Sequence, residues 1–450
     1  MSDIKTEVFC LTAPDGRLLP PAIQATVLAK YSRSPLSARQ IVAQLTPEEA
    51  DKFQDKWVID FNHSSVAELA VIPICFEGVS IIASKFLESF QRPGYSEKST
   101  RYQVFSRDSF ITPPGAPATM AAFAARFYNA YDSLYPKVVR RVATLLGKDP
   151  TDPKVLEERT VKARAFDNVR YLLPAGTGTN LAWVGNMRDA RYMISAARGH
   201  SNPEIRRLGD LAATAIAEMC PVFVKQADPD SFEPTIQSLG NLSPKFDFAN
   251  PQWYVDFHRK HMLLDSNLVQ KSFESLVADR HGMSWSAFSK LMESRGKRAV
   301  PKVFRTINLS FDIMMDYGAF RDLQRHRRCE QYVEPLHQNY GYLVPDDIAG
   351  SELELEYRTA MKAVHAYDDE HVVHDSDLMQ YMVPLGFLHR SIFDMDAQEV
   401  YYLSELRTQP QGHISYRRVA YEIFRISSER LPQVFQWCRA IKPDEIGLHT

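Results

Sequence analysis

Four residues with basic side chains stand in consecutive positions, Arg325, His326, Arg327 and Arg328, within "FRDLQRHRRCEQYVEPLHQNY". Guanidinium groups stay charged and bind phosphate or carboxylate oxygens through paired hydrogen bonds. The cluster follows an apolar, helix-like run, and cations also suit the negative end of a helix dipole. Charge runs are mostly solvated surfaces. These residues alone therefore leave open a solvated helix end, a nucleic-acid patch and a site for a phosphate-bearing small molecule.

A second candidate lies in "GYSEKSTRY", where Glu97, Ser99 and Arg101 alternate with other residues. In an extended segment these three side chains point the same way. A carboxylate, a hydroxyl and a guanidinium on one face can bind a polar ligand. An exposed edge strand with ordinary ion pairs gives the same pattern, so both interpretations stay open.

Two further polar segments are weaker signals. In "NHSSVAE", Ser65 and Glu68 have the spacing of a helix capping box, next to His63. In "HAYDDEHVVHD", histidines at 371 and 374 share a helix face, but no second cluster completes a metal site. The glycine-rich patterns GxGxxG and GxxxxGK are absent from the sequence, so a Rossmann dinucleotide site and a P-loop are unsupported.

Composition limits the class of protein. The chain has 450 residues and a formal net charge of −2, which indicates two or three domains and no general attraction to nucleic acid. The N-terminal residues do not resemble a secretory signal, and no apolar stretch reaches the roughly 20 residues of a membrane span. Five scattered cysteines without a CxxC pair disfavour a disulfide scaffold and a thiolate zinc site, so we expect a cytoplasmic protein.

The chain contains a diverged internal repeat. Two segments open with Tyr-apolar-apolar-Pro, at Tyr171 and Tyr381, and each continues through an amphipathic helix to a lone arginine, Arg198 or Arg407. A break and a second amphipathic helix follow in both, and both end near Pro-Val-Phe or Pro-x-Val-Phe. Upstream, a strand-like segment leading into a helix precedes each copy. We therefore predict a tandem duplication with a first repeat over 1–225, a linker over 226–270 and a second repeat over 271–450.

The elements that must position the candidate residues are mostly helical. Residues 118–146 and 354–373 carry apolar residues at helical spacing. Residues 70–76 and 101–105 have the apolar and β-branched content of strands. The predicted fold class is α+β, with helices around a small sheet in each repeat and the two repeats paired as an intramolecular pseudo-dimer.

Together these motifs resemble the flavin-dependent thymidylate synthases. The signature of that family is Arg-His-Arg, seven residues and a serine followed by Arg-Tyr, with a His-x-Ser-x-x-Glu segment ahead of it and an Asn-x-Arg helix after it. The chain resembles a double-length member whose halves have each lost part of the signature. The first half keeps His63, Ser65, Glu68, Glu97, Ser99, Arg101, Arg170, Asn186, Arg188 and Arg198, and the second keeps Gln324, Arg325, His326, Arg327 and Arg407.

The losses are complementary. "ESFQRP" replaces Arg-His-Arg in the first half, and Pro335 replaces the signature serine in the second. Gln380, Asp396 and Gln398 stand in the second half at the places of Arg170, Asn186 and Arg188. The resemblance therefore implies one surviving composite site.

What the resemblance implies for each residue is as follows. The deoxyuridylate (dUMP) site would combine Gln324 and Arg325 with Glu97, Ser99, Arg101 and Arg170. The FAD site would combine His326 and Arg327 with His63, Ser65, Asn186 and Arg188. Arg407 would stabilise negative charge on the uracil ring.

The implied reaction transfers a methylene from methylenetetrahydrofolate to C5 of dUMP, with hydride from reduced FAD and NADPH as the reductant. Asp322 departs from the family, which usually has a glutamine there. A related C5 transfer on another pyrimidine nucleotide is therefore one alternative. A non-catalytic nucleotide- or flavin-binding descendant is a separate alternative. We expect a homodimer equivalent to the family's tetramer, without a nucleic-acid or membrane partner.

Overall fold

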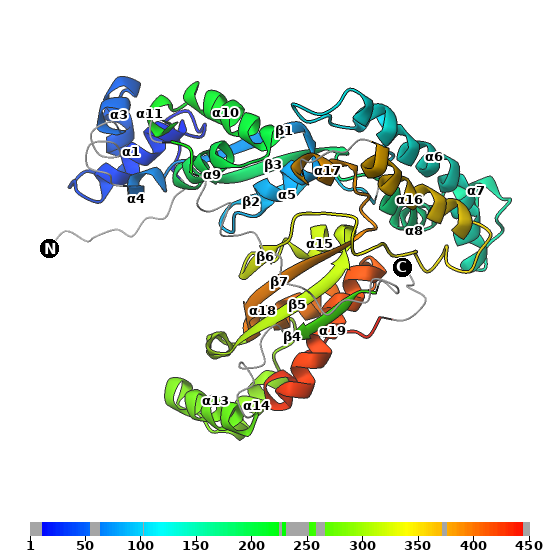
Figure 1. The fold of residues 1–450 in the computed structure, drawn as a ribbon. Coiled ribbons are helices and arrows are strands. Elements are labelled where there is room, and N and C mark those ends of the chain that lie inside the picture. Colours follow the sequence, from blue (N-terminus) through cyan, green and yellow to red (C-terminus); the bar gives the residue numbers. More distant parts are fainter. Residues whose placement is uncertain are drawn as a thin grey trace. The chain divides into compact units, whose positions relative to one another are not determined.

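The computed structural model describes residues 11–54, 64–101, 103–224, 227–230, 252–257, 266–370 and 376–443. The chain forms two compact units. Figure 1 shows their helices and strands. Unit 1 comprises Met1–Glu77, Arg92–Glu97 and Asn180–Thr235, and unit 2 comprises Gly78–Gln91, Lys98–Thr179 and Ile236–Thr450. The predicted boundaries at 225 and 271 stay a prediction, and strand β4 lies inside the range predicted as a linker.

Unit 1 contains most of a three-stranded sheet and a set of helices. The strand order is β1-β3-β2, with β1 at Val71–Ser80, β2 at Gly94–Glu97 and β3 at Gly178–Asn186. Its helices are α1 (Pro21–Tyr31), α2 (Ala38–Gln44), α3 (Pro47–Gln54), α4 (Ser64–Ala67), α9 (Met187–Gly199), α10 (Pro203–Ala217) and α11 (Pro221–Val224). Strand β1 contains the predicted strand at 70–76 except for its first residue.

Unit 2 is built around a four-stranded antiparallel sheet. The strand order is β4-β5-β7-β6, with β4 at Tyr254–Phe257, β5 at Asn308–Asp316, β6 at Cys329–Val333 and β7 at Leu388–Asp396. The register of the central pair runs from Asn308 opposite Asp396 to Asp316 opposite Leu388. Both faces of β5 and β7 are largely buried, so helices and loops cover the sheet on both sides.

The helices of unit 2 share one large hydrophobic core with this sheet. Helices α18 and α19 pack against each other and against the strands, and α6 packs against α8 and α16. The α-helices are α5 (Ile81–Glu88), α6 (Thr119–Leu145), α7 (Pro153–Leu156), α8 (Arg159–Val169), α13 (Ser266–His281), α14 (Trp285–Glu293), α15 (Tyr317–Leu323), α16 (Glu354–Glu370), α17 (Ser376–Met379), α18 (Ala397–Arg407), α19 (Ile414–Arg430) and α20 (Pro432–Phe435). Short 3₁₀ turns are η2 (Arg107–Ser109), η3 (Arg170–Leu172), η5 (Lys302–Thr306) and η6 (Gln380–Met382).

The two repeats meet at a seam with two-fold symmetry inside unit 2. Pro174 lies opposite Pro384 in an antiparallel bridge, so the two Tyr-x-x-Pro segments pair with each other. Four backbone hydrogen bonds flank this bridge as two symmetric pairs: Ala175 N to Val383 O (2.9 Å) with Leu385 N to Leu173 O (2.9 Å), and Gly176 N to Tyr381 O (2.8 Å) with Gly386 N to Tyr171 O (3.0 Å). Each bond and its partner are related by the same shift along the sequence, which is the pattern of a symmetric dimer interface.

The similarity between the two repeats includes the residues that cap the N-termini of their helices. Ser80 caps α5 and Asp316 caps α15, and in each case the side chain accepts a hydrogen bond from the backbone N–H three residues later. Asn186 caps α9 and Asp396 caps α18 in the same way. The predicted duplication and the α+β class with a pseudo-dimeric arrangement are confirmed.

Two local predictions are wrong, and a third concerns residues that lie outside the described ranges. Arg101 and residues 103–105 form turns and irregular structure, so the predicted strand at 101–105 is wrong. Helix α4 begins at Ser64, which places Ser65 inside the helix and not at its N-cap, so the predicted capping box is also wrong. His63, His371 and His374 lie outside the described residues. The predicted helices at 118–146 and 354–373 match α6 and α16. None of the helices among the described residues is long and apolar enough to cross a membrane.

Candidate functional site

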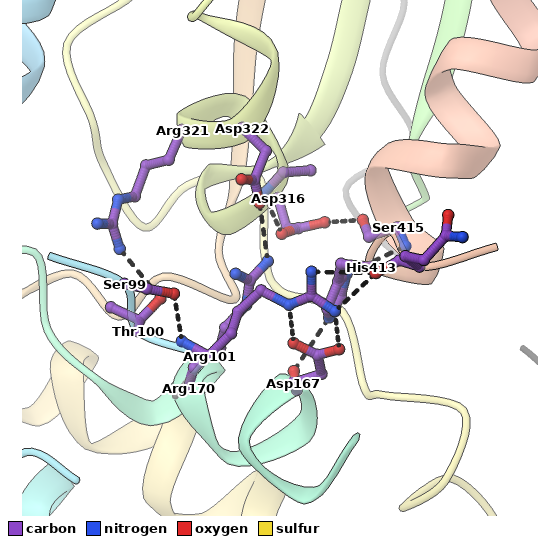
Figure 2. Close-up of polar contacts among 12 residues, drawn as sticks. Ser99, Thr100, Arg101, Asp167, Arg170, Asp316, Arg321, Asp322, His413 and Ser415 are labelled. Atoms are coloured by element: carbon purple, nitrogen blue, oxygen red, sulfur yellow. Dashed lines mark hydrogen bonds and ion pairs between the residues drawn. The ribbon is translucent and has the colours of Figure 1, made fainter. Parts of the chain in front are cut away.

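The first wall of the site is built around Arg101. Strand β2 ends at Glu97, and the chain then turns, with the backbone N–H of Arg101 donating to the Ser99 hydroxyl at 3.2 Å. The predicted alternation of Glu97, Ser99 and Arg101 on an extended face is therefore wrong. The Arg101 guanidinium instead binds Asp167 of α8 bidentately, at 2.6 and 2.8 Å, and also donates to the backbone oxygen of Gln411 at 3.3 Å (Figure 2).

The Arg101–Asp167 pair is mostly buried, and the two partners hold each other charged. Burial alone would lower the pKa of Arg101, but Asp167 raises it above its ordinary value. Burial alone would raise the pKa of Asp167, but His413, Arg101 and Arg170 together lower it. The pair thus fixes the guanidinium plane at the start of the loop after β2.

Arg170 extends from the first repeat toward the second. It stands at the end of α8, is 3% exposed, and its Nη2 lies 3.5 Å from Oδ2 of Asp322 in α15 (Figure 2). Nε and Nη2 of Arg170 and Oδ2 of Asp322 are buried and make no hydrogen bond within the described residues. Unsatisfied charged groups of this kind are costly to bury, so they indicate a place that a polar ligand or water completes.

Asp322 lies in the field of four arginines from both repeats. Burial by itself would raise the pKa of this carboxyl group, but the charges of Arg170, Arg325, Arg407 and Arg101 outweigh it and lower the pKa below the ordinary value. Asp322 is therefore ionised at neutral pH. The four guanidiniums come from four different elements of unit 2, which is the arrangement expected of an anion-binding cluster.

The end of α15 supplies the second wall. Helix α15 ends at Leu323, and Gln324 is its C-cap, so Arg325 follows the last turn as predicted from the sequence. Gln324 is buried and donates from Nε2 to the backbone oxygen of Lys85 at 2.8 Å, while its Oε1 has no hydrogen bond within the described residues. Arg325 is exposed. One turn earlier, Arg321 donates to the Thr100 hydroxyl at 3.5 Å, next to Ser99 (Figure 2).

Arg407 is held by a chain of hydrogen bonds at the end of α18. Its Nε donates to Nε2 of His326 at 2.8 Å, and Nδ1 of His326 lies 2.8 Å from Oε1 of Glu399. His326 is 2% exposed, and burial lowers its pKa, although Glu399 opposes that shift. Both ring nitrogens of His326 are thus engaged inside the protein.

A network of buried, hydrogen-bonded polar side chains adjoins the site. Asp316 caps α15 and also accepts a hydrogen bond from the Ser415 hydroxyl. His413 caps α19 by accepting from Ser415 N–H at 3.1 Å, and its Nε2 lies 3.0 Å from the backbone oxygen of Asp167 (Figure 2). Because Nδ1 accepts, Nε2 carries the proton, which fixes one neutral tautomer. This network ties α8, α15 and α19 together.

The symmetry-related position in unit 2 is filled by other residues. Phe86 follows Ser80, the N-cap of α5, by the same number of residues as Asp322 follows Asp316, the N-cap of α15. Gln380, in the place of Arg170, accepts from Leu336 N–H and donates to Asp377, both at 3.1 Å. The mirror position therefore lacks both the central carboxylate and its arginine.

The remaining predicted flavin residues are distributed over both units. In unit 1, Asn186 caps α9 and binds Asp189 at 2.8 Å, and Arg188 pairs with Glu68 at 2.5 Å. Ser65 is exposed in α4. Glu97, also in unit 1, is the last residue of β2.

In unit 2, Arg327 is exposed and lines a hollow together with Asn308, Ser310 and Asp394. Arg328 donates to Gln398 at 2.6 Å and pairs with Asp396.

Asp167, Glu399 and His413 were missed by reasoning from sequence. Asp167 lies in the last turn of α8, three residues before Arg170, which directly follows that helix, and this spacing puts both on one face. That spacing was the one available signal. Glu399 and His413 are far from their partners in sequence, and only the fold brings them to the site.

Comparison with known proteins matches both repeats to one family. The family model described as "Thymidylate synthase complementing protein" matches residues 21–222 and 261–433. The chain is similar to a UPF0159 protein of Chlamydia pneumoniae, with 28% identity over an alignment of 484 positions that covers 94% of this chain and 90% of that protein. A UPF0159 protein of Chlamydia muridarum is 26% identical over an alignment of 480 positions, with the same coverage of 94% and 90%.

Two solved structures align with about half of the chain. One is the flavin-dependent thymidylate synthase ThyX of Helicobacter pylori in complex with FAD and dUMP, with 15% identity, a TM-score of 0.31 and coverage of 46% of this chain and 94% of that one. The other is the UMP/dUMP methylase PolB of Streptomyces cacaoi bound with 5-Br dUMP, with 16% identity, a TM-score of 0.32 and coverage of 45% and 88%.

Proposed function

The chain belongs to the thymidylate synthase complementing protein family. We propose that it binds dUMP at one composite site and methylates C5 of its ring. The methylene donor would be methylenetetrahydrofolate, with FAD as cofactor and NADPH as reductant. Both repeats contribute residues to this site, so one chain carries one working site.

Two features of the arginines support the nucleotide part of this proposal. Arg101 and Arg170 of the first repeat and Arg325 and Arg407 of the second all act on the same carboxylate, Asp322. Arg170 keeps buried N–H groups without a hydrogen bond partner in the described part of the chain. A phosphate oxygen is the ligand that would satisfy them.

The protein's own residues would bind and orient the substrate. Arg101, Arg170 and Arg325 would clamp the nucleotide phosphate, since guanidinium groups match phosphate oxygens in geometry and charge. Ser99 and Gln324, with Glu97 from the end of β2, would complete the nucleotide contacts. Arg407 would stabilise the negative charge that develops on the uracil ring as its N3 side ionises, which is an electrostatic and not a nucleophilic role.

Residues that would hold FAD come from both repeats: His63, Ser65, Asn186, Arg188, His326 and Arg327. Arg327 fits this role best in the described structure because it is exposed beside a hollow. His326 fits less directly, because its ring nitrogens already bind Glu399 and Arg407, so its contribution would be through the ring and through Arg407. When bound, FAD supplies the hydride chemistry that side chains do not provide.

A second candidate is a nucleotide-binding protein of the same family without catalytic activity, or one that acts on another pyrimidine nucleotide. Asp322 favours this candidate, because it puts a negative charge among the arginines that would hold the substrate phosphate. The engagement of Arg188 with Glu68 and of Asn186 with Asp189 points the same way.

The test uses the purified full chain. FAD uptake is followed by the flavin absorption spectrum, dUMP binding by calorimetry, and methylation by formation of dTMP with methylenetetrahydrofolate and NADPH. Formation of dTMP supports the proposal. Binding of dUMP and FAD without dTMP supports the non-catalytic candidate. A protein that takes up no FAD and is not stabilised by dUMP contradicts both.

The composite site has its own matched test in the two lone arginines. Arg407→Ala is expected to weaken dUMP binding by about tenfold or more, the effect of removing one charged hydrogen-bonding partner. Arg198→Ala is the control, because Arg198 pairs with Asp210 at 2.8 Å and donates to the backbone oxygen of Ala227 at 2.8 Å. Equal effects of the two substitutions would contradict a single site.

A further inference from the structure

Asp322 holds the position inside the arginine cluster where an incoming anion would be bound. Its Oδ2 lies 3.5 Å from Nη2 of Arg170, and its side chain is 17% exposed. Figure 2 shows the two side chains pointing toward each other across the site. No hydrogen bond from the described residues reaches that oxygen. The contact is therefore an ion pair without the close, directional geometry of Arg101 with Asp167.

The contrast between the two arginine–aspartate pairs indicates different roles. Arg101 and Asp167 are joined by two short hydrogen bonds, so neither exchanges partners at low cost. Arg170 and Asp322 are close enough to attract each other but leave hydrogen-bonding capacity on both sides. A loosely held counter-ion is the one that a better ligand can replace.

The charges around the site lead to the same conclusion. Asp322 is one carboxylate in the field of four guanidiniums, so the field at its position favours an anion. A phosphate monoester dianion would be attracted to the same place. It would also lie near an ionised carboxylate, and two like charges at a few ångströms in a partly buried site repel each other.

We propose that Asp322 is a built-in counter-ion of the substrate site, which stabilises the arginine cluster without ligand and competes with the phosphate of the bound nucleotide. This inference rests on the proposed function for the identity of the nucleotide, but its competition with phosphate can be tested without one. Asp322 thus weakens binding and limits how much charge the site accepts. It acts as a specificity residue and takes no part in the chemical step.

The decisive experiment compares wild type with Asp322→Asn, using inorganic phosphate, pyrophosphate, dUMP and deoxyuridine as probes. The asparagine side chain has nearly the same shape as that of aspartate and carries no charge. Without ligand, the variant is expected to melt at a lower temperature, because Arg170 loses its counter-ion. Each phosphate-bearing probe is expected to bind the variant about tenfold or more tightly than wild type, given the size of charge–charge terms at a protein surface. Pyrophosphate should gain most and deoxyuridine least.

Two controls isolate the effect. Asp312→Asn removes another carboxylate of unit 2 that binds an arginine bidentately, Arg390 at 2.9 and 2.7 Å, away from the cluster. It should lower the melting temperature and leave phosphate affinity unchanged. Asp322→Glu keeps the charge and should bind phosphate no more tightly than wild type.

Failure of this inference and failure of the proposed function give different results. The counter-ion role of Asp322 is overturned if wild type and Asp322→Asn bind phosphate and pyrophosphate equally well, or if the variant binds them more weakly. If Asp322→Asn binds phosphate more tightly than wild type and neither protein binds dUMP, the counter-ion role of Asp322 stands and the nucleotide assignment is contradicted. If Asp322→Asn does not fold, the pair Asp322→Asn with Arg170→Gln is compared with Arg170→Gln alone. The double variant should bind phosphate more tightly, and equal affinities overturn the proposal.

Discussion

Nε of Arg407 lies 2.8 Å from Nε2 of His326, so the arginine that would act on the substrate ring is held by an imidazole. An arginine N–H can only donate, so Nε2 accepts and the ring proton is on Nδ1. That proton points to Glu399, 2.8 Å away. The direction of the guanidinium is therefore set by a carboxylate two hydrogen bonds away.

His326→Phe tests this chain of hydrogen bonds. Phenylalanine keeps a ring in the space, and the first repeat has a phenylalanine, Phe90, in the corresponding stretch "ESFQRP". The change leaves the Glu399 carboxylate buried without its partner, so unfolding in urea should show a loss of about 2–4 kcal/mol. Binding of dUMP should also weaken, because Arg407 is no longer directed.

The second variant separates the two effects. Adding Glu399→Gln to His326→Phe removes the buried charge, so it should recover part of the lost stability and none of the lost dUMP affinity. A His326→Phe protein as stable as wild type, or one whose dUMP binding returns with the second change, would contradict this role.

Asp167→Asn tests the contribution of the bidentate Arg101–Asp167 ion pair to stability. It leaves the Arg101 guanidinium partly buried opposite an amide that cannot accept two charged hydrogen bonds. We expect a loss of about 3 kcal/mol in the free energy of unfolding, measured in urea. Asp346→Asn is the matched control, since its pair with Arg418 is exposed and should contribute less than about 1 kcal/mol. Similar losses in the two variants would count against a special role for Asp167.

The pH dependence of stability should contain a clear histidine contribution. Burial, together with the charge of Arg170, lowers the pKa of His413 to about 4 from an ordinary value of 6.5. The unfolded chain therefore binds this proton at a higher pH than the folded chain does. Stability from this group is complete above pH 6.5 and is lost as the pH falls from 6.5 toward 4, by on the order of 3 kcal/mol.

The measurement is urea unfolding at about pH 7, 6, 5 and 4.5, which spans the range between the two pKa values. His413→Asn keeps a side chain that can cap α19 and removes the titration, so its stability should fall less steeply over this range. The same substitution at the exposed His281 is the control and should follow wild type. A variant at 413 whose stability falls as steeply as wild type would contradict the assignment.

The seam between the repeats should be sensitive to one added methyl group. A Cβ at Gly176 would lie 2.5 Å from Phe110 Cε2 and 2.9 Å from the backbone oxygen of Tyr381. The carbonyl cannot move without breaking the bond that Gly176 N–H makes to it. Gly176→Ala should therefore cost about 1–3 kcal/mol in urea unfolding. Gly94→Ala, whose new methyl group would have 3.8 Å to its nearest neighbour, should be close to neutral, and equal effects would contradict the close packing.

The repeat was predictable because it depends on order along the chain. Two Tyr-x-x-Pro segments at matching places predicted a pair of similar units, and Pro174 and Pro384 indeed lie opposite each other. The position of Arg325 just after a helix followed from the apolar run before it. Long amphipathic periods also predicted α6 and α16 well, since burial of one face determines them.

The local geometry of the site was not predictable in the same way. The segment after Glu97 has the composition of a strand, but the chain turns there. The Arg101 side chain binds Asp167, which is 66 residues away in sequence. Glu399 and Asp167 look like ordinary helix carboxylates until the fold brings them to His326 and Arg101. Pairing across such distances is a tertiary effect that local patterns do not carry.

The symmetric hydrogen bonds at the seam have a consequence for how such a site can change over generations. In a dimer of identical chains every substitution appears twice, so a residue cannot improve one pocket without altering its twin. Here both partners are parts of a single polypeptide, always present in equal number. Phe86 and Gln380 could therefore fill one pocket while Asp322 and Arg170 stayed in the other, an asymmetry that two copies of one short gene product cannot acquire.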